Sequence, residues 1–340
     1  MHMADALLSP VVGGVMWAAS AGTLVYCSKK ITSAMDELKT PLMGVLGAFI
    51  FAAQMINFTI PGTGSSGHLG GGMILAILLG PNAAFLVMAS ILTVQALFFA
   101  DGGLLALGCN MFNLGVFPCF IAYPLIYKTI LGDSGDYKRI TAASILSVIT
   151  ALQLGSLGVV METSLSGITE LPLSSFAFVM QPIHLAIGLI EGIVTAVVIQ
   201  FIIKVEPDIL NNYNLTAPSR HRSRKPLFIS LLVVTLFTGG FLSWYASSNP
   251  DGLEWSITKV TGQEELHVVK NNRVHSFLSQ IQEKIAFLPE YGFKNSGAEE
   301  TAENRRTGTA ISGILGGIIT IALVFLAGFF LKKRTHTETS

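Results

Sequence analysis

Eight apolar runs, each about as long as a membrane-spanning helix, limit what this chain can fold into more than any other feature of its sequence. A helix needs roughly 18–20 apolar residues to cross a membrane. The runs lie at about residues 9–27, 41–60, 83–100, 103–127, 139–161, 183–203, 227–246 and 309–331, with a shorter apolar piece at 71–79. Charged residues are only 12% of the 340, about half the roughly 25% of a soluble domain. The sequence therefore predicts an all-α integral membrane protein.

Basic residues at the ends of the runs predict how the chain crosses the membrane, because Lys and Arg favour the cytoplasmic side. Lys29 and Lys30 follow the first run, so the N-terminus is expected outside the cytoplasm. The loop at 61–72 then falls on the outer side. The basic residues that follow Tyr127 fall inside if the chain crosses an odd number of times in between. One crossing would leave too much apolar chain, so three crossings are predicted. The short piece 71–79 supplies one of these crossings, which gives a first bundle of seven helices.

A polar linker divides the chain into two modules. Residues 1–205 are predicted to form the seven-helix bundle, residues 206–226 a cytoplasmic linker, and residues 227–340 a second module. The two apolar runs of the second module flank a polar segment at about 247–307, which the same rule places outside. We therefore expect a module of two transmembrane helices joined by an extracytoplasmic loop.

One glycine-rich loop, PGTGSSGHLGGG at 61–72, contains the pattern G-x-G-x-x-G of dinucleotide-binding proteins. Those proteins place a strand before the pattern and an acidic residue roughly 20 positions after it. Here a membrane-length run precedes the loop, and no acidic residue lies between His68 and Asp101. The pattern therefore does not predict a nucleotide site, and a net charge of zero gives no support for a nucleic-acid partner. The glycines suit a turn, but a turn does not explain His68.

The N-terminus offers an unusual set of nitrogen donors. The Met1 amine, the backbone nitrogen of His2 once deprotonated, and one imidazole nitrogen of His2 can bind one ion through fused chelate rings. Such rings favour a planar arrangement, which suits Ni(II) or Cu(II). Three donors leave one corner empty, and the predicted topology brings His68 to the same side to fill it. Without a second histidine nearby, His2 would be read as an incidental terminal residue.

Other polar residues are predicted close to this site. They are expected on the outer side, where they can hydrogen-bond the ligands: Gln54, Asn57, Ser66, Gln95, Asp101 and His184. Bridging between helices is an equal alternative for the three amides, and contact of Asp101 or His184 with the metal is left open. Glu191 lies about two turns from His184 and fits either a proton relay or a structural partner.

Four segments of the first module resemble one family. They read MHMADALLSP, AAQMINFTIPGTGSSGHLGGG, QALFFADGGLLALGCNMFNLGV and QPIHLAIGLIEGIVTA, and they resemble the CbiM/NikM type. These are the substrate-binding membrane components of energy-coupling-factor transporters for cobalt and nickel. The second module, with PDGLEWSI at 250–257, is similar to the PDGLE domain, which is related to the accessory component CbiN or NikN.

The resemblance implies a function and a ligand set. It implies a metal-binding component in a prokaryotic cell membrane, with the Met1 amine, His2 and His68 as ligands. It also implies a transmembrane coupling component and two cytoplasmic ABC-type ATPase subunits as partners. Ala6 departs from the glycine that many members have after the aspartate. A planar all-nitrogen site favours Ni(II), with Co(II) as the other candidate.

Other functions are weighed against this one. The chain has no nucleotide-hydrolysis motif and no H-E-x-x-H motif, so neither an ATPase nor an intramembrane metallohydrolase is predicted. The alternative is a metal-selective channel or a membrane metal sensor without active transport. A channel favours a continuous polar path, and the cytoplasmic half of the bundle supplies little beyond Glu191.

Overall fold

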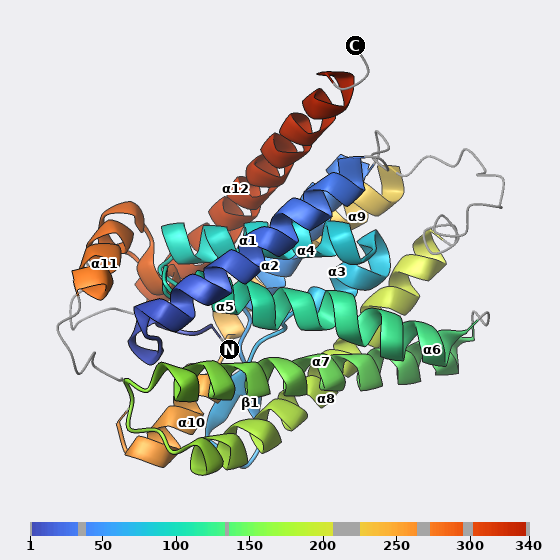
Figure 1. Cartoon of the computed structure of the whole chain (residues 1–340). Helices are drawn as coiled ribbons and strands as arrows, with labels where there is room; N and C mark the ends of the chain where they lie inside the picture. The colour runs from blue at the N-terminus through green and yellow to red at the C-terminus, as the bar shows by residue number, and fades with distance from the viewer. Residues whose placement is uncertain are drawn as a thin grey trace.

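The structure is a computed structural model that describes residues 2–32, 39–132, 136–206, 225–263, 273–294 and 302–337. Helices account for nearly all of this part of the chain (Figure 1). The only strands among the described residues are β1 (Phe58–Ile60) and β2 (Ser65–Gly67), which pair antiparallel as a short hairpin. The helical fold class is therefore confirmed, and the one departure is this hairpin at the glycine-rich loop.

Seven helices form the described part of the first module, in agreement with the predicted number. They are α1 (Pro10–Thr32), α2 (Lys39–Gln54), α3 (Gly72–Leu79), α4 (Pro81–Phe98), a continuous helix made of α5 (Leu107–Met111), η2 (Phe112–Tyr127) and α6 (Lys128–Leu131), α7 (Tyr137–Ser166) and α8 (Leu173–Val205). The short apolar piece is α3, and all its residues are buried. A helix this short is tolerated at membrane depth because neighbouring protein, here α4 and η2, packs against it.

Prolines lie inside two of these helices without ending them. Pro118 and Pro124 lie in η2, where the backbone is π-helical from Phe112 to Tyr127. A proline removes one backbone donor and crowds the preceding turn, and local widening of the helix is one way to accommodate it. Pro182 lies inside α8, which begins at Leu173. The predicted start of that span at 183 is therefore about three turns too late.

The second module packs against the first through several of its helices, and the C-terminal part of α12 projects beyond the bundle (Figure 1). Its elements are α9 (Lys225–Gly240), η5 (Leu242–Tyr245), α10 (Gly252–Thr261), α11 (Arg273–Ile285), η6 (Pro289–Tyr291) and α12 (Ala302–Thr337). The helices α9 and α12 contact α2 and each other, whereas α10 packs on α8 and α11 on α4. The described parts of the polar segment between α9 and α12 are thus partly helical and pack on the first module.

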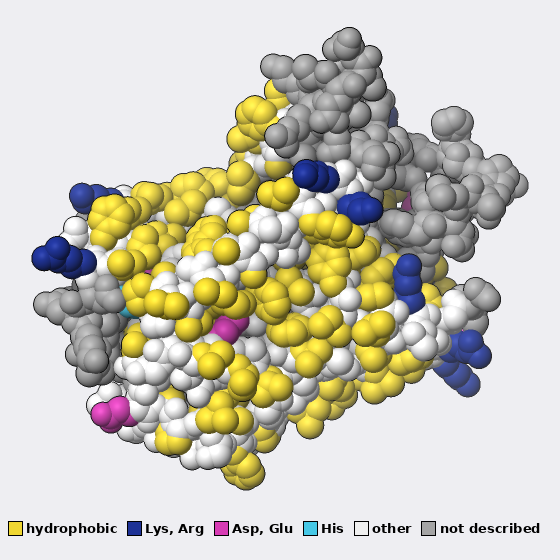
Figure 2. All heavy atoms as spheres, viewed as in Figure 1, with side chains coloured by type: hydrophobic (Ala, Val, Ile, Leu, Met, Phe, Trp, Pro, Cys, Tyr) yellow, Lys and Arg dark blue, Asp and Glu magenta, His cyan; other side chains and the backbone are white. Residues whose placement is uncertain are grey.

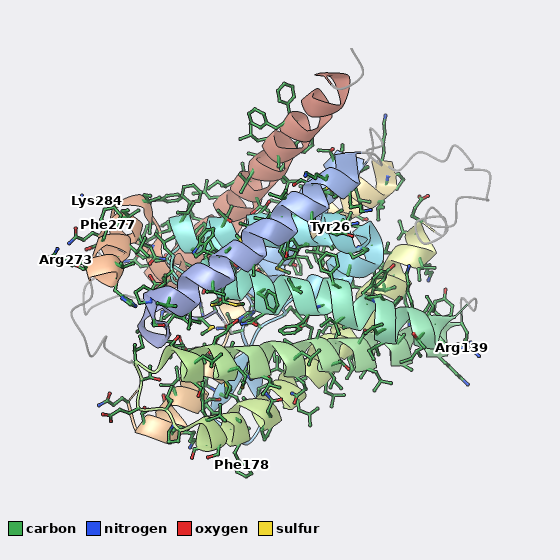
Figure 3. All side chains as sticks on the ribbon, in the orientation of Figure 1. Tyr26, Arg139, Phe178, Arg273, Phe277 and Lys284 are labelled. Atoms are coloured by element: carbon green, nitrogen blue, oxygen red, sulfur yellow. The ribbon has the colours of Figure 1, made fainter. Side chains whose placement is uncertain are left out.

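The surface of the bundle is apolar, as a membrane requires. Hydrophobic side chains cover the middle of the face shown in Figure 2, and most Lys and Arg side chains lie near its ends. Figure 3 shows Phe178 of α8 pointing away from the bundle, and this side chain is 80% exposed. Seven helices of the described residues are long and apolar enough to cross a membrane. The chain is therefore a multi-pass membrane protein.

Packing inside the bundle, rather than hydrophobicity alone, should decide its stability, because lipid is as apolar as the core. Phe85 of α4 is fully buried against Phe120. Phe85→Ala leaves a cavity and should lower the free energy of unfolding by about 2–5 kcal/mol. Phe178→Ala is the matched control, since that ring faces outward. Thermal unfolding in detergent measures both, and equal melting temperatures would contradict the prediction.

Candidate functional site

The N-terminal segment runs from α1 back into the helix bundle (Figure 1). Met3 is fully buried there. Its main-chain N–H donates to Asn110 Oδ1 at 2.8 Å, and its carbonyl accepts from Asn110 Nδ2 at 3.3 Å and from the N–H of Gly103 at 2.9 Å. The side chain of one asparagine thus satisfies both polar groups of residue 3 and fixes the position of the adjacent His2.

Asp5 fastens the following turn, η1 (Asp5–Leu7), to the loop before α5. The N–H of Ala106 donates to Asp5 Oδ1 at 3.0 Å. A Cβ atom at Gly103 would lie 1.8 Å from the same oxygen, so only glycine fits beside this carboxylate. Burial raises the pKa of Asp5. The segment is therefore held by specific contacts on both sides of residue 3.

Two helices hold the backbone that follows His68. Glu191 of α8 accepts from the N–H groups of Gly70 and Gly71, each at 2.9 Å. Gln54 of α2 donates to the carbonyl of Gly70 at 2.8 Å, and Gln95 of α4 donates to Gln54 Oε1 at 2.8 Å. These contacts support a structural role for Glu191 rather than a proton relay. Gln54 and Gln95 bridge two helices and also support the histidine loop.

The imidazole rings of His2 and His68 are stacked on each other. Their centroids are 5.1 Å apart and their planes differ by 10°. Imidazole nitrogens bind a metal at about 2 Å, so the centroids of two rings on one ion lie roughly 4.5–6 Å apart. The observed spacing falls in this range. Burial lowers the pKa of His2, and burial likewise lowers the pKa of His68 to about 3. Both rings are therefore neutral, the form that binds metals.

Asp101 contacts the first of these rings. Its Oδ1 lies 3.2 Å from His2 Nδ1, and His2 Nε2 is buried with no hydrogen-bond partner among the described residues. The other carboxylate oxygen, Oδ2, accepts a hydrogen bond from the hydroxyl of Tyr291. Asp101 therefore links the His2 ring to a residue of the second module.

His184 lines a cavity that it shares with His68 and Asp251. Its Nδ1 donates to the carbonyl of Met180 at 2.8 Å, and its Nε2 is buried without a partner. A Cβ atom at Gly252 would lie 3.1 Å from Cε1 of the His184 ring. The glycine of the PDGLE sequence therefore lets the second module pack directly against this imidazole.

The other predicted site residues bind the second module rather than a ligand ring. Ser66 donates its hydroxyl to the carbonyl of Asn249 at 2.8 Å and its N–H to that of Pro250 at 2.8 Å. The carbonyl of Asn57 accepts from the N–H of Ser247 at 2.7 Å. Met1 lies outside the described residues. Within the described ranges no three His, Cys, Asp or Glu side chains converge closely enough to hold a metal, and the predicted set uses only two.

Sequence reasoning missed Asp251 and Tyr291, the residues that the second module brings to this region. The PDGLE motif was the available signal for Asp251, because it marks the start of α10. There the Asp251 and Glu254 side chains form a capping box. Tyr291 carries no signal in the sequence, since a tyrosine in a polar segment is ordinary.

Comparison with known proteins identifies the first module. Residues 2–209 match the CbiM family, described as the cobalt uptake substrate-specific transmembrane region. This chain belongs to the CbiM family. Residues 225–333 match the PDGLE domain, so a CbiM region and a PDGLE module are fused in this one chain.

Relatives of this CbiM family member include other fused chains. It is 31% identical to a putative fused nickel transport protein NikMN of Archaeoglobus fulgidus, over 99% of this chain and 100% of that one. It is 32% identical to a putative cobalt transport protein CbiM of Methanocorpusculum labreanum, over 62% of this chain and 92% of that one. A crystal structure of a transition metal transporter is 29% identical, covers 64% of this chain and all of the other, and superposes with a TM-score of 0.54.

These similarities establish the general function. The chain is a nickel or cobalt transport protein of the CbiM family with the fold of a transition metal transporter. Its relatives are metal transport proteins, as expected for a transporter component that is not an enzyme.

The carboxylate of Glu191 should be needed to hold the histidine loop. Glu191→Ala leaves two buried backbone N–H groups without an acceptor, at a cost of about 1–3 kcal/mol each. We expect a lower melting temperature and roughly 10–100-fold weaker Ni(II) binding, the usual effect of losing a support of a ligand. Glu170→Ala is the control, since Glu170 is exposed. Competition with a chromophoric chelator measures affinity, and equal values for the two variants would refute the role.

Proposed function

We propose that this chain binds Ni(II), with Co(II) as its second substrate, at the extracytoplasmic face of the membrane. It then delivers the ion for ATP-driven uptake as the substrate-specific subunit of an energy-coupling-factor transporter. The observation that carries the proposal is the pair of neutral imidazoles of His2 and His68, 5.1 Å apart beside a buried N-terminal segment. Two relatives named as fused nickel transport proteins, one matching 99% of this chain and the other 65%, support nickel as the first substrate.

The proposed donors are four nitrogens. They are the Met1 amine, the deprotonated backbone nitrogen and Nδ1 of His2, and one imidazole nitrogen of His68. The chelate closes through Nδ1 because this atom completes a six-membered ring with the backbone nitrogen of His2, whereas Nε2 lies farther along the ring. Four nitrogens in a plane suit Ni(II). The neutral state of both imidazoles means that the ion does not displace protons from them.

Closure of this chelate requires the His2 ring to turn. In the structure His2 Nδ1 faces Asp101. A half-turn about the Cβ–Cγ bond moves Nδ1 to the opposite edge of the ring and brings Nε2 to the former place of Cε1, one bond from the old Nδ1 position. Asp101 then accepts from Nε2–H instead. The same carboxylate can therefore hold the ring before and after the metal binds.

Transport in this proposal depends on partners. A transmembrane coupling component and two cytoplasmic ABC-type ATPase subunits supply the energy, because the sequence of this chain has no nucleotide-hydrolysis motif. The chain itself captures the ion, removes it from water and presents it to the assembly. Ni(II) uptake into vesicles that contain the complete transporter would stop without ATP, whereas a channel would still conduct the ion.

Extending the chain by two residues ahead of Met1 should abolish high-affinity Ni(II) binding. The extension converts the terminal amine into an amide and removes one donor of the chelate. The loss should exceed the roughly 10–100-fold effect of removing an outer hydrogen bond. Bound metal is measured by elemental analysis of the purified protein, and the same two residues added after Ser340 are the control. Full nickel content in the extended protein would refute the role of the terminal amine as a ligand.

A further inference from the structure

We propose that the second module completes the metal site with a positioning residue: Tyr291 orients Asp101, and Asp101 orients the imidazole of His2. The inference rests on the proposed function, since it assumes that His2 is a ligand. It adds a role for the PDGLE-containing module, which the sequence alone leaves without one. The contacts of three elements carry it: the N-terminal segment, the loop after α4, and η6.

Two polar contacts connect the second module to His2. The Tyr291 hydroxyl donates to Asp101 Oδ2, and Asp101 Oδ1 lies 3.2 Å from His2 Nδ1. Burial and the neighbouring Asp101 charge raise the pKa of Tyr291 well above its usual value. The phenol therefore keeps its proton and acts as a donor. Metal-binding histidines commonly donate their second ring nitrogen to a carboxylate that is itself hydrogen-bonded, and after the half-turn of the His2 ring Asp101 would accept from Nε2 in this way.

Backbone strain is concentrated at this contact. In the described chain, the non-glycine residues with positive φ are Ala100 at 54°, Glu290 at 50° and Tyr291 at 62°. Ala100 directly precedes Asp101, and the other two lie in η6. Such conformations are energetically unfavourable for residues other than glycine and persist where surrounding contacts impose them. The two strained turns thus direct the side chains of Asp101 and Tyr291 toward each other.

Hydrogen bonds from one backbone N–H and one side-chain amide hold the two turns together. The N–H of Glu290 donates to the carbonyl of Phe99 at 2.7 Å. Gln282 of α11 donates to the carbonyls of Ala96 at 2.9 Å and Gly102 at 2.8 Å, on either side of Asp101. The opposite face of α11, with Arg273, Phe277 and Lys284, points away from the bundle in Figure 3. The loop that carries Asp101 is therefore held from outside by the second module.

Packing alone does not require the hydroxyl of Tyr291. Its ring stacks on Phe99 with centroids 5.2 Å apart and planes at 24°, and phenylalanine would preserve this contact. The hydroxyl adds the hydrogen bond to Asp101 and an interaction with Gln95. Tyr291→Phe therefore separates a positioning role from a structural one.

The test compares Tyr291→Phe, Asp101→Asn and the double variant in the full chain. Affinity for Ni(II) is measured by chelator competition, and the ligand geometry by the visible absorption of bound Ni(II). We expect each single variant to bind roughly 10–100-fold more weakly, with a shifted absorption band and an unchanged melting temperature. The double variant should be no weaker than Asp101→Asn, because residues of one network are not additive. Phe287→Leu, which alters packing on Phe98 and Phe99 without a polar link, is the control and should bind within about two-fold of the native chain.

Two results would overturn the inference. One is native affinity and an unshifted band in Tyr291→Phe at an unchanged melting temperature. The other is full additivity of the two substitutions, since independent effects would show that the hydroxyl does not act through Asp101. If Tyr291→Phe lowers the melting temperature, the Ni(II) affinity and absorption spectrum of Asp101→Asn test the contact between Asp101 and His2 on their own. Failure of the chelate itself is recognised separately, because the N-terminally extended protein would then bind Ni(II) normally.

Discussion

The pairing between the main chain of Met3 and the side chain of Asn110 is the interaction on which the site depends. A free N-terminus loses conformational entropy when it is ordered inside a bundle, and its peptide groups lose water. Asn110 compensates by giving residue 3 both a donor and an acceptor. His2 directly precedes Met3, so the position of its ring depends on this pairing and on the contact with Asp101. The stacked position beside His68 requires both.

The second module contacts each of the three stretches that carry site residues. It meets the hairpin before His68 through Ser66 and Pro250, and the N-terminal segment through His275, whose ring bonds the carbonyl of Leu8 at 2.8 Å. It meets the loop of Asp101 through Tyr291. An ion held at this place is therefore enclosed by both modules. Its entry and release require some of these contacts to open, which gives the fused arrangement a physical purpose.

The sequence predicted the features that depend on residue type, and it predicted the features that depend on contacts between distant segments less well. The membrane spans follow from apolar length, and the pairing of His2 with His68 follows from topology and donor chemistry. The start of α8 was missed because Pro182 resembles a helix boundary, although neighbouring helices can satisfy the backbone that a proline leaves open. Tyr291 was missed because its role depends on positive φ angles at Ala100 and Tyr291. Such conformations arise from tertiary contacts between distant segments and leave no local pattern.

Charge compensation explains why two aspartates surround the proposed site. A divalent ion bound by a neutral amine, one deprotonated amide and two neutral imidazoles keeps a net charge of about +1, which is costly in a buried position. Asp101, in contact with His2, supplies one negative charge. Asp251 shares the cavity of His68, and its carboxylate accepts the N–H groups of Leu253 and Glu254 at the start of α10. The N-terminus of α10 stabilises that negative charge. With the deprotonated amide and both carboxylates counted, a dication held at this place would leave a net charge of about −1, and one of the two carboxylates comes from the second module.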